Sequence, residues 1–138
     1  MPREYEFTGL DEQGRRVYGL LIKGQDPGED ASVDQLNYQH LISWHTPEGQ
    51  IEMRPVHKDS IGEYTGRLDS AQNRLFEGDL VQDGDDVGTV ELSNGEYVLK
   101  IEGRADVPIR DKQDSEIIVV GTKAENPDLL SSPKIARV

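Results

Sequence analysis

The chain has 138 residues, of which 34% are hydrophobic and 30% charged, and this length and composition suit one domain with a modest core. Acidic residues outnumber basic ones by 27 to 15, and a net charge of −12 repels phosphate backbones, which disfavours ordinary nucleic-acid binding. The absence of cysteine excludes disulfides and thiol chemistry, and no apolar run reaches the roughly 18 residues of a membrane span.

The N-terminal region predicts a hairpin followed by an acidic loop. Residues 3–8 alternate, with Tyr5 and Phe7 on one side, as in a half-buried strand. After a turn at residues 11–14, residues 16–23 form the second strand. Residues 24–35 are rich in acids, glycine and proline, which predicts a mobile loop that ends in one helical turn capped by Ser32.

A second hairpin is predicted further along the chain. Residues 38–44 favour a strand, residues 46–49 place proline and glycine as in a turn, and residues 50–56 return. Ile51 and Met53 share one face of this returning strand.

The stretch IGEYTGRLDSAQNRLFEGDLV, residues 61–81, repeats the pattern of residues 6–22, EFTGLDEQGRRVYGLLI. Thr8 aligns with Thr65, Asp11 with Asp69 and Arg16 with Arg74. Two copies are too few for a solenoid, so we interpret them as one hairpin used twice. The alternative is that any strand, turn and strand resemble any other.

The register of the next hairpin follows from Asn94-Gly95, the strongest short-range signal of a two-residue turn. This turn predicts four facing pairs and a shared buried face, together with sharp strand bends at Gly78 and Gly88 that are typical of a small SH3-like barrel. The expected pairs are Ser93 with Glu96, Leu92 with Tyr97, Glu91 with Val98 and Val90 with Leu99, and the expected buried face holds Val90, Leu92, Tyr97 and Leu99.

The C-terminal part predicts one more strand. Residues 103–115 read as a polar, mobile connection, and the apolar run at residues 116–121 fits a central strand that is buried on both faces. Asn126 and Pro127 suit the cap and first position of a helical turn whose leucines, Leu129 and Leu130, cover the core. Residues 131–138 are expected to fray.

Four blocks of the sequence resemble the YopX family of phage and prophage proteins: residues 17–22, 60–66, 75–81 and 119–130. The resemblance implies an all-β fold and no activity, because the family is functionally uncharacterised. Arg67 departs from the family pattern as an extra residue, and Gln72-Asn73 stands where an Asn-Gly turn is usual. The blocks and the strand pattern predict one domain over residues 1–138, a hairpin-rich two-sheet sandwich with a small SH3-like barrel portion and at most one or two short helical turns.

Residues in the matching blocks are candidate site residues, which we interpret as structural: Tyr64, Thr65, Gly66, Glu77, Gly78, Asp79, Asn126 and Pro127. Asp79 in particular is expected to accept backbone N–H groups in a turn. The histidines His40, His45 and His57 match no zinc spacing, and residues 83–86 lack the offsets of a calcium loop. No catalytic or phosphate-binding motif is present, so neither metal nor cofactor is expected.

These observations predict a non-enzymatic phage or prophage accessory protein that binds an unknown host or phage protein in the bacterial cytoplasm. One alternative is a DNA mimic whose carboxylates imitate phosphates, and another is a hydrolase that uses acidic residues near Asp79. The N-terminus lacks the apolar segment of a signal peptide. The acidic surface predicts a monomer, with a weak dimer as the alternative if Tyr38 and Trp44 are exposed.

Overall fold

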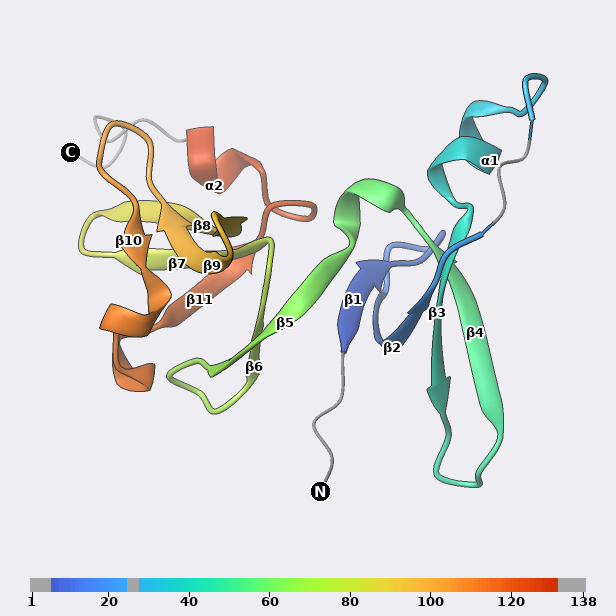
Figure 1. The fold of residues 1–138 in the computed structure, drawn as a ribbon, viewed down its shortest axis with the longest axis horizontal. Coiled ribbons are helices and arrows are strands. Elements are labelled where there is room, and N and C mark those ends of the chain that lie inside the picture. Colours follow the sequence, from blue (N-terminus) through green and yellow to red (C-terminus); the bar gives the residue numbers. More distant parts are fainter. Residues whose placement is uncertain (1–5, 25–27, 132–138) are drawn as a thin grey trace. The chain divides into compact units, whose positions relative to one another are not determined.

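The computed structural model describes residues 6–24 and 28–131, and the chain divides into two compact units, Met1–Tyr64 and Thr65–Val138. The predicted all-β class is confirmed: the described residues form two antiparallel sheets and two short α-helices (Figure 1). Each unit is described by itself below. The assignment of the whole chain to one domain stays a prediction.

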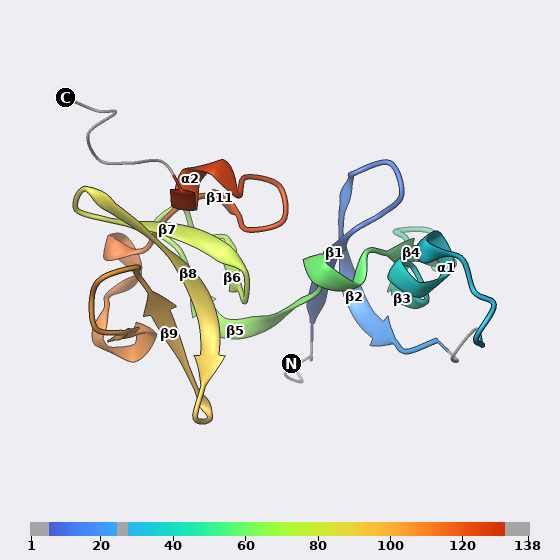
Figure 2. The ribbon, with the colours of Figure 1, turned by 90° about the horizontal axis from the view of Figure 1, so that it is seen from above.

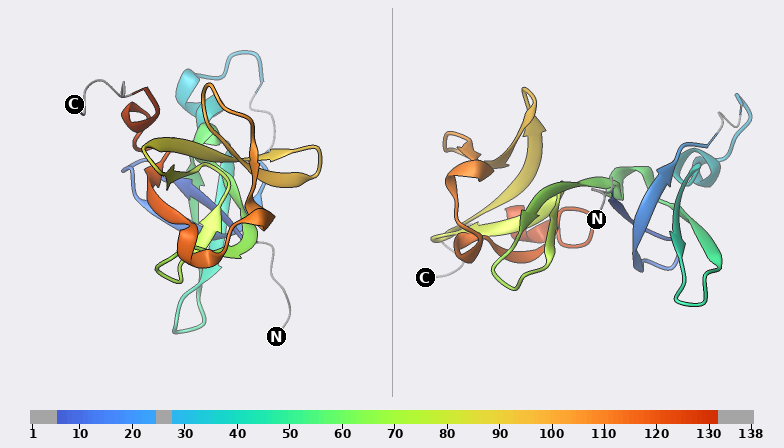
Figure 3. Two further views of the ribbon diagram at one scale, coloured as in Figure 1. Left: turned by 90° about the vertical axis from the view of Figure 1, so that its left-hand side faces the viewer. Right: turned by 60° about the horizontal axis from the view of Figure 1, so that its bottom comes forward.

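Unit 1 is a single antiparallel sheet with the strand order β4-β3-β2-β1, and the start of β5 pairs with β1. Figures 1 and 3 show β3 and β4 as its long outer hairpin. Its elements are β1 (Phe7–Leu10), β2 (Arg16–Ile22), α1 (Val33–Asn37), β3 (His40–His45), β4 (Ile51–Val56), the 3₁₀ turn η1 (Lys58–Ser60) and β5 (Gly62–Leu68), which continues into unit 2.

The start of unit 1 differs in part from the sequence prediction. The first described strand is β1, later than residues 3–8, and Tyr5 lies outside the described residues. The helical turn after Ser32 is confirmed, because the Ser32 hydroxyl accepts the Gln35 N–H at 3.1 Å and the Gln35 side chain accepts the Ser32 N–H at 2.8 Å. Reciprocal bonds of this kind satisfy donors that a helix start leaves open.

The sheet of unit 1 buries one face only. Ile42 and Val56 are the fully buried hydrophobic side chains among the described residues of this unit. Gly9 lies against Val56, since a Cβ built there would be 3.0 Å from the Val56 Cβ. At Gly19 a Cβ would come within 2.0 Å of the Ser43 carbonyl oxygen, so the close approach of β2 and β3 requires glycine.

Unit 2 contains a five-stranded sheet with the order β10-β9-β8-β7-β11, which curls into a half-barrel (Figure 2). Its core joins seven buried side chains: Leu75, Val81, Val90, Leu99, Ile101, Ile109 and Ile117. The elements are β6 (Arg74–Phe76), β7 (Asp79–Asp83), β8 (Asp86–Ser93), β9 (Glu96–Lys100), β10 (Val107–Pro108), the 3₁₀ turns η2 (Ile109–Asp111) and η3 (Asp114–Glu116), β11 (Ile118–Thr122) and α2 (Asp128–Ser131).

The register predicted from Asn94-Gly95 is confirmed at all four pairs. Both turn residues have positive φ, 52° for Asn94 and 84° for Gly95, as a type I′ turn requires. The predicted buried face is wrong at one position. Leu92 is 51% exposed because β8 extends past the core toward the turn, and its partner Tyr97 is only half-buried.

The prediction for the apolar run 116–121 is wrong. Its strand, β11, pairs with β7 alone and forms an edge of the sheet, so it alternates instead of burying both faces. Ile117 is buried and Val119 packs against the core, whereas Ile118 is 48% and Val120 37% exposed. A β-bulge between Val119 and Gly121 interrupts this edge, which is one way in which proteins discourage edge-to-edge pairing.

The connection at residues 103–115 is more structured than its polar sequence predicts. It contains β10, η2 and the start of η3, and it contributes the buried Ile109 to the core. Three ion pairs hold it to the β7–β8 turn: Arg104 contacts Asp83 at 3.0 Å and Asp86 at 2.9 Å, and Lys112 contacts Asp83 at 3.2 Å. These contacts could not be predicted from the local sequence, because they join residues about 20 or more positions apart.

Two neighbouring isoleucines test the edge position of β11. We expect Ile117→Ala to lower the free energy of unfolding by about 2–5 kcal/mol, as for other buried large-to-small changes. Ile118→Ala, the matched control, should change it by less than about 1 kcal/mol because this side chain is half exposed. Urea unfolding followed by circular dichroism measures both, and equal losses would contradict the edge assignment.

Candidate interaction face

Asp79, the acidic candidate in the matching blocks, is a turn residue. Its carboxylate is buried, and its Oδ2 accepts the Phe76 N–H at 2.8 Å. Gly78 adopts φ 95°, and its N–H donates to the Val90 carbonyl at 2.8 Å. The prediction that Asp79 accepts a backbone N–H at a turn is therefore confirmed: Glu77 and Gly78 form the β6–β7 connection, and Asp79 begins β7.

The other candidate residues also make contacts that shape the backbone. The Thr65 hydroxyl donates to the Leu75 carbonyl at 2.9 Å, Gly66 has φ 91°, and the Tyr64 N–H donates to the Glu6 carbonyl at 2.8 Å. These bonds fix the course of β5 within each unit. They do not gather the candidate residues into one cleft.

Asn126 has a role different from the predicted helix cap. Its side-chain oxygen accepts the Thr122 N–H at 3.1 Å, which ties the end of β11 to the following loop. A Cβ at Gly121 would lie 2.4 Å from this oxygen, so the position needs glycine. Pro127 begins the turn, where its carbonyl accepts the Leu130 N–H at 3.1 Å. Leu129 is 36% exposed, so it does not cover the core as predicted.

The two hairpins that the sequence repeat predicts are built with the same hydrogen bonds. Asp11 Oδ1 accepts the N–H groups of Gln13 and Arg15 at 3.0 and 2.8 Å. Asp69 Oδ1 accepts those of Ala71 and Asn73 at 2.8 and 2.9 Å.

The match extends beyond the aspartates. The Thr8 hydroxyl donates to the Val17 carbonyl at 3.0 Å, as Thr65 does to Leu75. Gly14 and Gln72, at corresponding positions, both have positive φ, 77° and 68°. The interpretation of one hairpin used twice is confirmed at this level.

The carboxylate of Asp11 also binds two arginines. Arg15 Nε and Arg54 Nη1 each lie 3.2 Å from its Oδ2. Burial acts to raise the pKa of Asp11, but the backbone N–H groups of Arg15 and Gln13, together with the Arg15 guanidinium, outweigh it and hold this pKa below its ordinary value. The charged form therefore stabilises the first hairpin.

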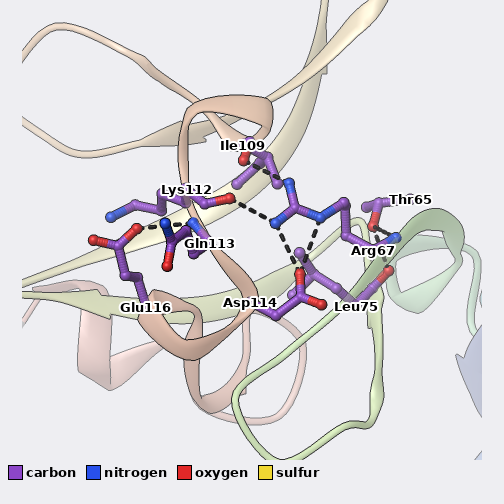
Figure 4. A network of polar contacts seen from close by, with 8 residues as sticks. All are labelled: Thr65, Arg67, Leu75, Ile109, Lys112, Gln113, Asp114 and Glu116. Carbon is purple, nitrogen blue, oxygen red and sulfur yellow. Dashed lines mark hydrogen bonds and ion pairs between the residues drawn. The ribbon is translucent and has the colours of Figure 1, made fainter.

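Arg67, the residue that departs from the family pattern, joins β5 to the η2–η3 segment (Figure 4). Its guanidinium donates to the Ile109 carbonyl at 2.9 Å, the Lys112 carbonyl at 2.6 Å and the Asp114 carboxylate at 2.8 Å. A cavity of about 340 Å³ lies beside it, lined by Thr65, Arg67, Glu96, Tyr97, Ile109 and Arg110. Because Arg67 is committed to these acceptors and Arg110 pairs with Glu96, we assign this region a structural role.

The histidines do not form a metal centre in the part of the chain that the structure describes, where no group of three or more potential ligands occurs. His57 Nδ1 accepts the Asp59 N–H at 3.1 Å, and its ring meets Tyr38 edge-on at 5.3 Å between centroids. Residues 83–86 are a hairpin turn whose Asp83 and Asp86 bind Arg104.

The sheet of unit 1 has a second face, opposite the one that holds Ile42 and Val56, and this second face is apolar although the chain as a whole is acidic. Register places Leu20, Ser43 and Met53 in one row across β2, β3 and β4, and Ile22, Leu41 and Pro55 in the next. We define the apolar face as these residues with their neighbours on the same side: Tyr18, Leu20, Ile22, Leu41, Ser43, His45, Ile51, Met53 and Pro55.

Five large side chains of the apolar face are exposed to solvent. The exposed fraction is 43% for Tyr18, 57% for Leu20, 40% for Ile22, 62% for Ile51 and 54% for Met53. None of the nine residues of the apolar face is Asp, Glu, Lys or Arg. Contiguous exposed apolar surface of this kind marks interaction sites. Sequence pattern placed Ile51 and Met53 on one face but did not show that solvent reaches it.

Comparison with known proteins agrees with the resemblance described above. The family model described as YopX protein matches residues 11–131, which is most of the chain. The chain belongs to the YopX family. No curated protein matches it. Among the described residues, no helix of this YopX-family chain has the length and apolar character to cross a membrane.

The lowered pKa of Asp11 predicts a pH dependence of stability. Because the folded-state pKa lies below the ordinary value of 3.8, the contribution of Asp11 is present above that pH and is lost as the pH falls through the folded pKa. We expect Asp11→Asn to lower the urea midpoint at neutral pH and to flatten its fall in acid. Glu12→Gln, an exposed neighbour, is the control, and an unchanged acid profile in Asp11→Asn would contradict this account.

Arg67 predicts a second stability effect in this YopX-family chain. Arg67→Lys keeps the charge, but one ammonium group cannot reach the two carbonyls and the carboxylate in the same fork. We expect a loss of about 1–3 kcal/mol in the free energy of unfolding. Lys58→Ala, an exposed change, serves as the control. An Arg67→Lys variant as stable as the parent in thermal and urea unfolding would show that the three guanidinium contacts are not needed for stability.

Proposed function

We propose that this protein is a non-enzymatic phage or prophage accessory protein that binds another protein through the apolar face of unit 1. The observation that supports it is the exposed apolar face of β2, β3 and β4, whose nine residues include no Asp, Glu, Lys or Arg. Interface cores are depleted in charged residues and enriched in aromatic residues and methionine, and Tyr18 and Met53 lie on this face. The proposed compartment is the bacterial cytoplasm.

The chemistry of the face favours protein over nucleic acid as the partner. Neutralising the charge of phosphates takes lysine and arginine, and the apolar face has neither, while the chain as a whole carries −12. Arg16 lies at the end of the same side of β2, where its guanidinium stacks on Tyr18 at 5.3 Å from the ring centroid and donates to the Thr8 hydroxyl. These contacts hold Arg16 against its own sheet.

The use of the carboxylates supports a binding role more than catalysis or DNA mimicry. Asp11, Asp69 and Asp79 are buried and accept backbone N–H groups. Asp83, Asp86 and Asp114 pair with basic side chains of the same unit. These acids serve the fold, whereas a hydrolase or a mimic needs carboxylates directed at a substrate or partner.

A capture experiment tests the proposed function. The tagged protein is incubated with host lysate, washed at low and at high salt, and compared with Leu20→Lys, which places a charge in the centre of the apolar face. Because apolar contacts resist salt, we expect a protein bound by the parent to survive the high-salt wash and to fall at least about tenfold in the variant, since burying an unpaired charge is costly.

Leu92→Lys is the matched control, because Leu92 is a similarly exposed strand leucine, at 51% against 57% for Leu20, and lies outside the apolar face. Circular dichroism confirms that both variants remain folded. Equal capture by the parent, Leu20→Lys and Leu92→Lys would overturn the proposed function.

A further inference from the structure

We infer that the partner seated on the apolar face is the same face of a second copy of this chain, in a two-fold symmetric pairing of two unit 1 sheets. The inference rests on the proposed function, because it uses the same surface. The inference identifies the binding partner, which the proposed function leaves open. Three features of unit 1, in the part that the structure describes, support it: no second layer covers the apolar face, the face has no charged residues, and its side chains form rows across three strands.

The first feature is that unit 1 is one layer thick over its apolar face. A sheet that is apolar on one face must bury that face against another layer, and stable domains have at least two layers. Among the described residues of unit 1, only Ile42 and Val56 are fully buried hydrophobic side chains, and they lie on the opposite side of the sheet. A second sheet would provide the layer that the apolar face lacks.

The second feature is the charge distribution. Two copies of a chain with net charge −12 repel each other wherever carboxylates meet. On the apolar face they would not meet, because charged residues of β4 such as Glu52 and Arg54 alternate onto the other side. Different proteins recognise each other partly through complementary charges, which the apolar face lacks. Homodimer interfaces are more apolar than the interfaces of transient complexes, so the face resembles them more closely.

The third feature is the shape and size of the face. Leu20, Ser43 and Met53 form a central row across three paired strands. The row that contains Ile22 lies on one side of it, and the pair of His45 and Ile51 lies on the other. Strand spacing and rise give a surface of about 15 by 20 Å, so roughly 300 Å² in projection. A standard interface takes about 800 Å² from each partner. The face is therefore smaller than a standard interface. It provides only the apolar centre of a weak, reversible dimer in the aligned packing of two sheets, and the polar residues around it would form the rim.

Molar mass in solution tests the inference directly. Analytical ultracentrifugation of the full chain across a concentration series, at low and at high salt, should show a monomer–dimer equilibrium whose dimer is retained or strengthened by salt. Leu20→Lys should weaken the dimer at least about tenfold and Leu92→Lys should leave it unchanged. A parent chain that stays monomeric to the highest soluble concentration would overturn the inference.

A cysteine placed in the central row provides a second readout that does not depend on destabilising the face. The natural chain has no cysteine, so Ser43→Cys introduces the only thiol. We expect Ser43→Cys to form a disulfide-linked dimer under mild oxidation, because a central position lies close to its own copy across a two-fold axis. Ser70→Cys, an exposed turn position in unit 2, is the control. Equal cross-linking of both variants, or none of Ser43→Cys, would count against the pairing.

The two experiments separate this inference from the proposed function. A salt-resistant dimer lost in Leu20→Lys supports both. A monomeric parent whose lysate partner is lost in Leu20→Lys overturns the second copy and retains the binding face. A monomeric parent whose capture is the same in all variants overturns both. A dimer that Leu20→Lys leaves intact would place self-association elsewhere and overturn the inference.

Discussion

Each unit of this chain starts from a hairpin whose turn is held by one buried aspartate. A buried carboxylate must find hydrogen-bond donors, and the turn supplies them as two backbone N–H groups, to Asp11 in unit 1 and to Asp69 in unit 2. A threonine hydroxyl then ties the two strands together behind each turn. These local bonds hold each hairpin without any distant contact, and in unit 1 the strands β3 and β4 extend the sheet from that first pair.

The two units use this common start differently. In unit 2, β6 is three residues long and Leu75 and Phe76 are buried, so the hairpin becomes part of a closed core. In unit 1, β2 continues for seven residues and alternates, so Tyr18, Leu20 and Ile22 face solvent. The same turn thus leads to a packed half-barrel in one unit and to an open, apolar sheet face in the other. An exposed apolar face results in unit 1.

The sequence predicted what local interactions determine. The Asn94-Gly95 register, the repeated hairpin and the turn role of Asp79 all follow from residues a few positions apart. Prediction from the sequence failed where contacts between residues far apart in the chain determine the structure. The apolar run at 117–120 is equally compatible with a central and an edge strand, and only its pairing with β7 alone leaves Ile118 and Val120 exposed. The acceptors of Arg67 lie more than 40 residues away, and the extra position between Gly66 and Leu68 was its only local signal.

The net charge is a sum over the whole chain, and the acidic residues that contribute to it have different roles in the structure. At least six of the 27 acidic residues have partners within the fold: Asp11, Asp69 and Asp79 hold turns, while Asp83, Asp86 and Asp114 hold loops through Arg104 and Arg67. A total of −12 therefore does not imply that every surface repels other acidic molecules. On the apolar face the strand alternation turns Glu52 and Arg54 away. Electrostatic repulsion is local at physiological salt, because it falls off over about 8 Å. The proposed binding at this face therefore depends on the burial of apolar surface and not on the charge of the whole chain.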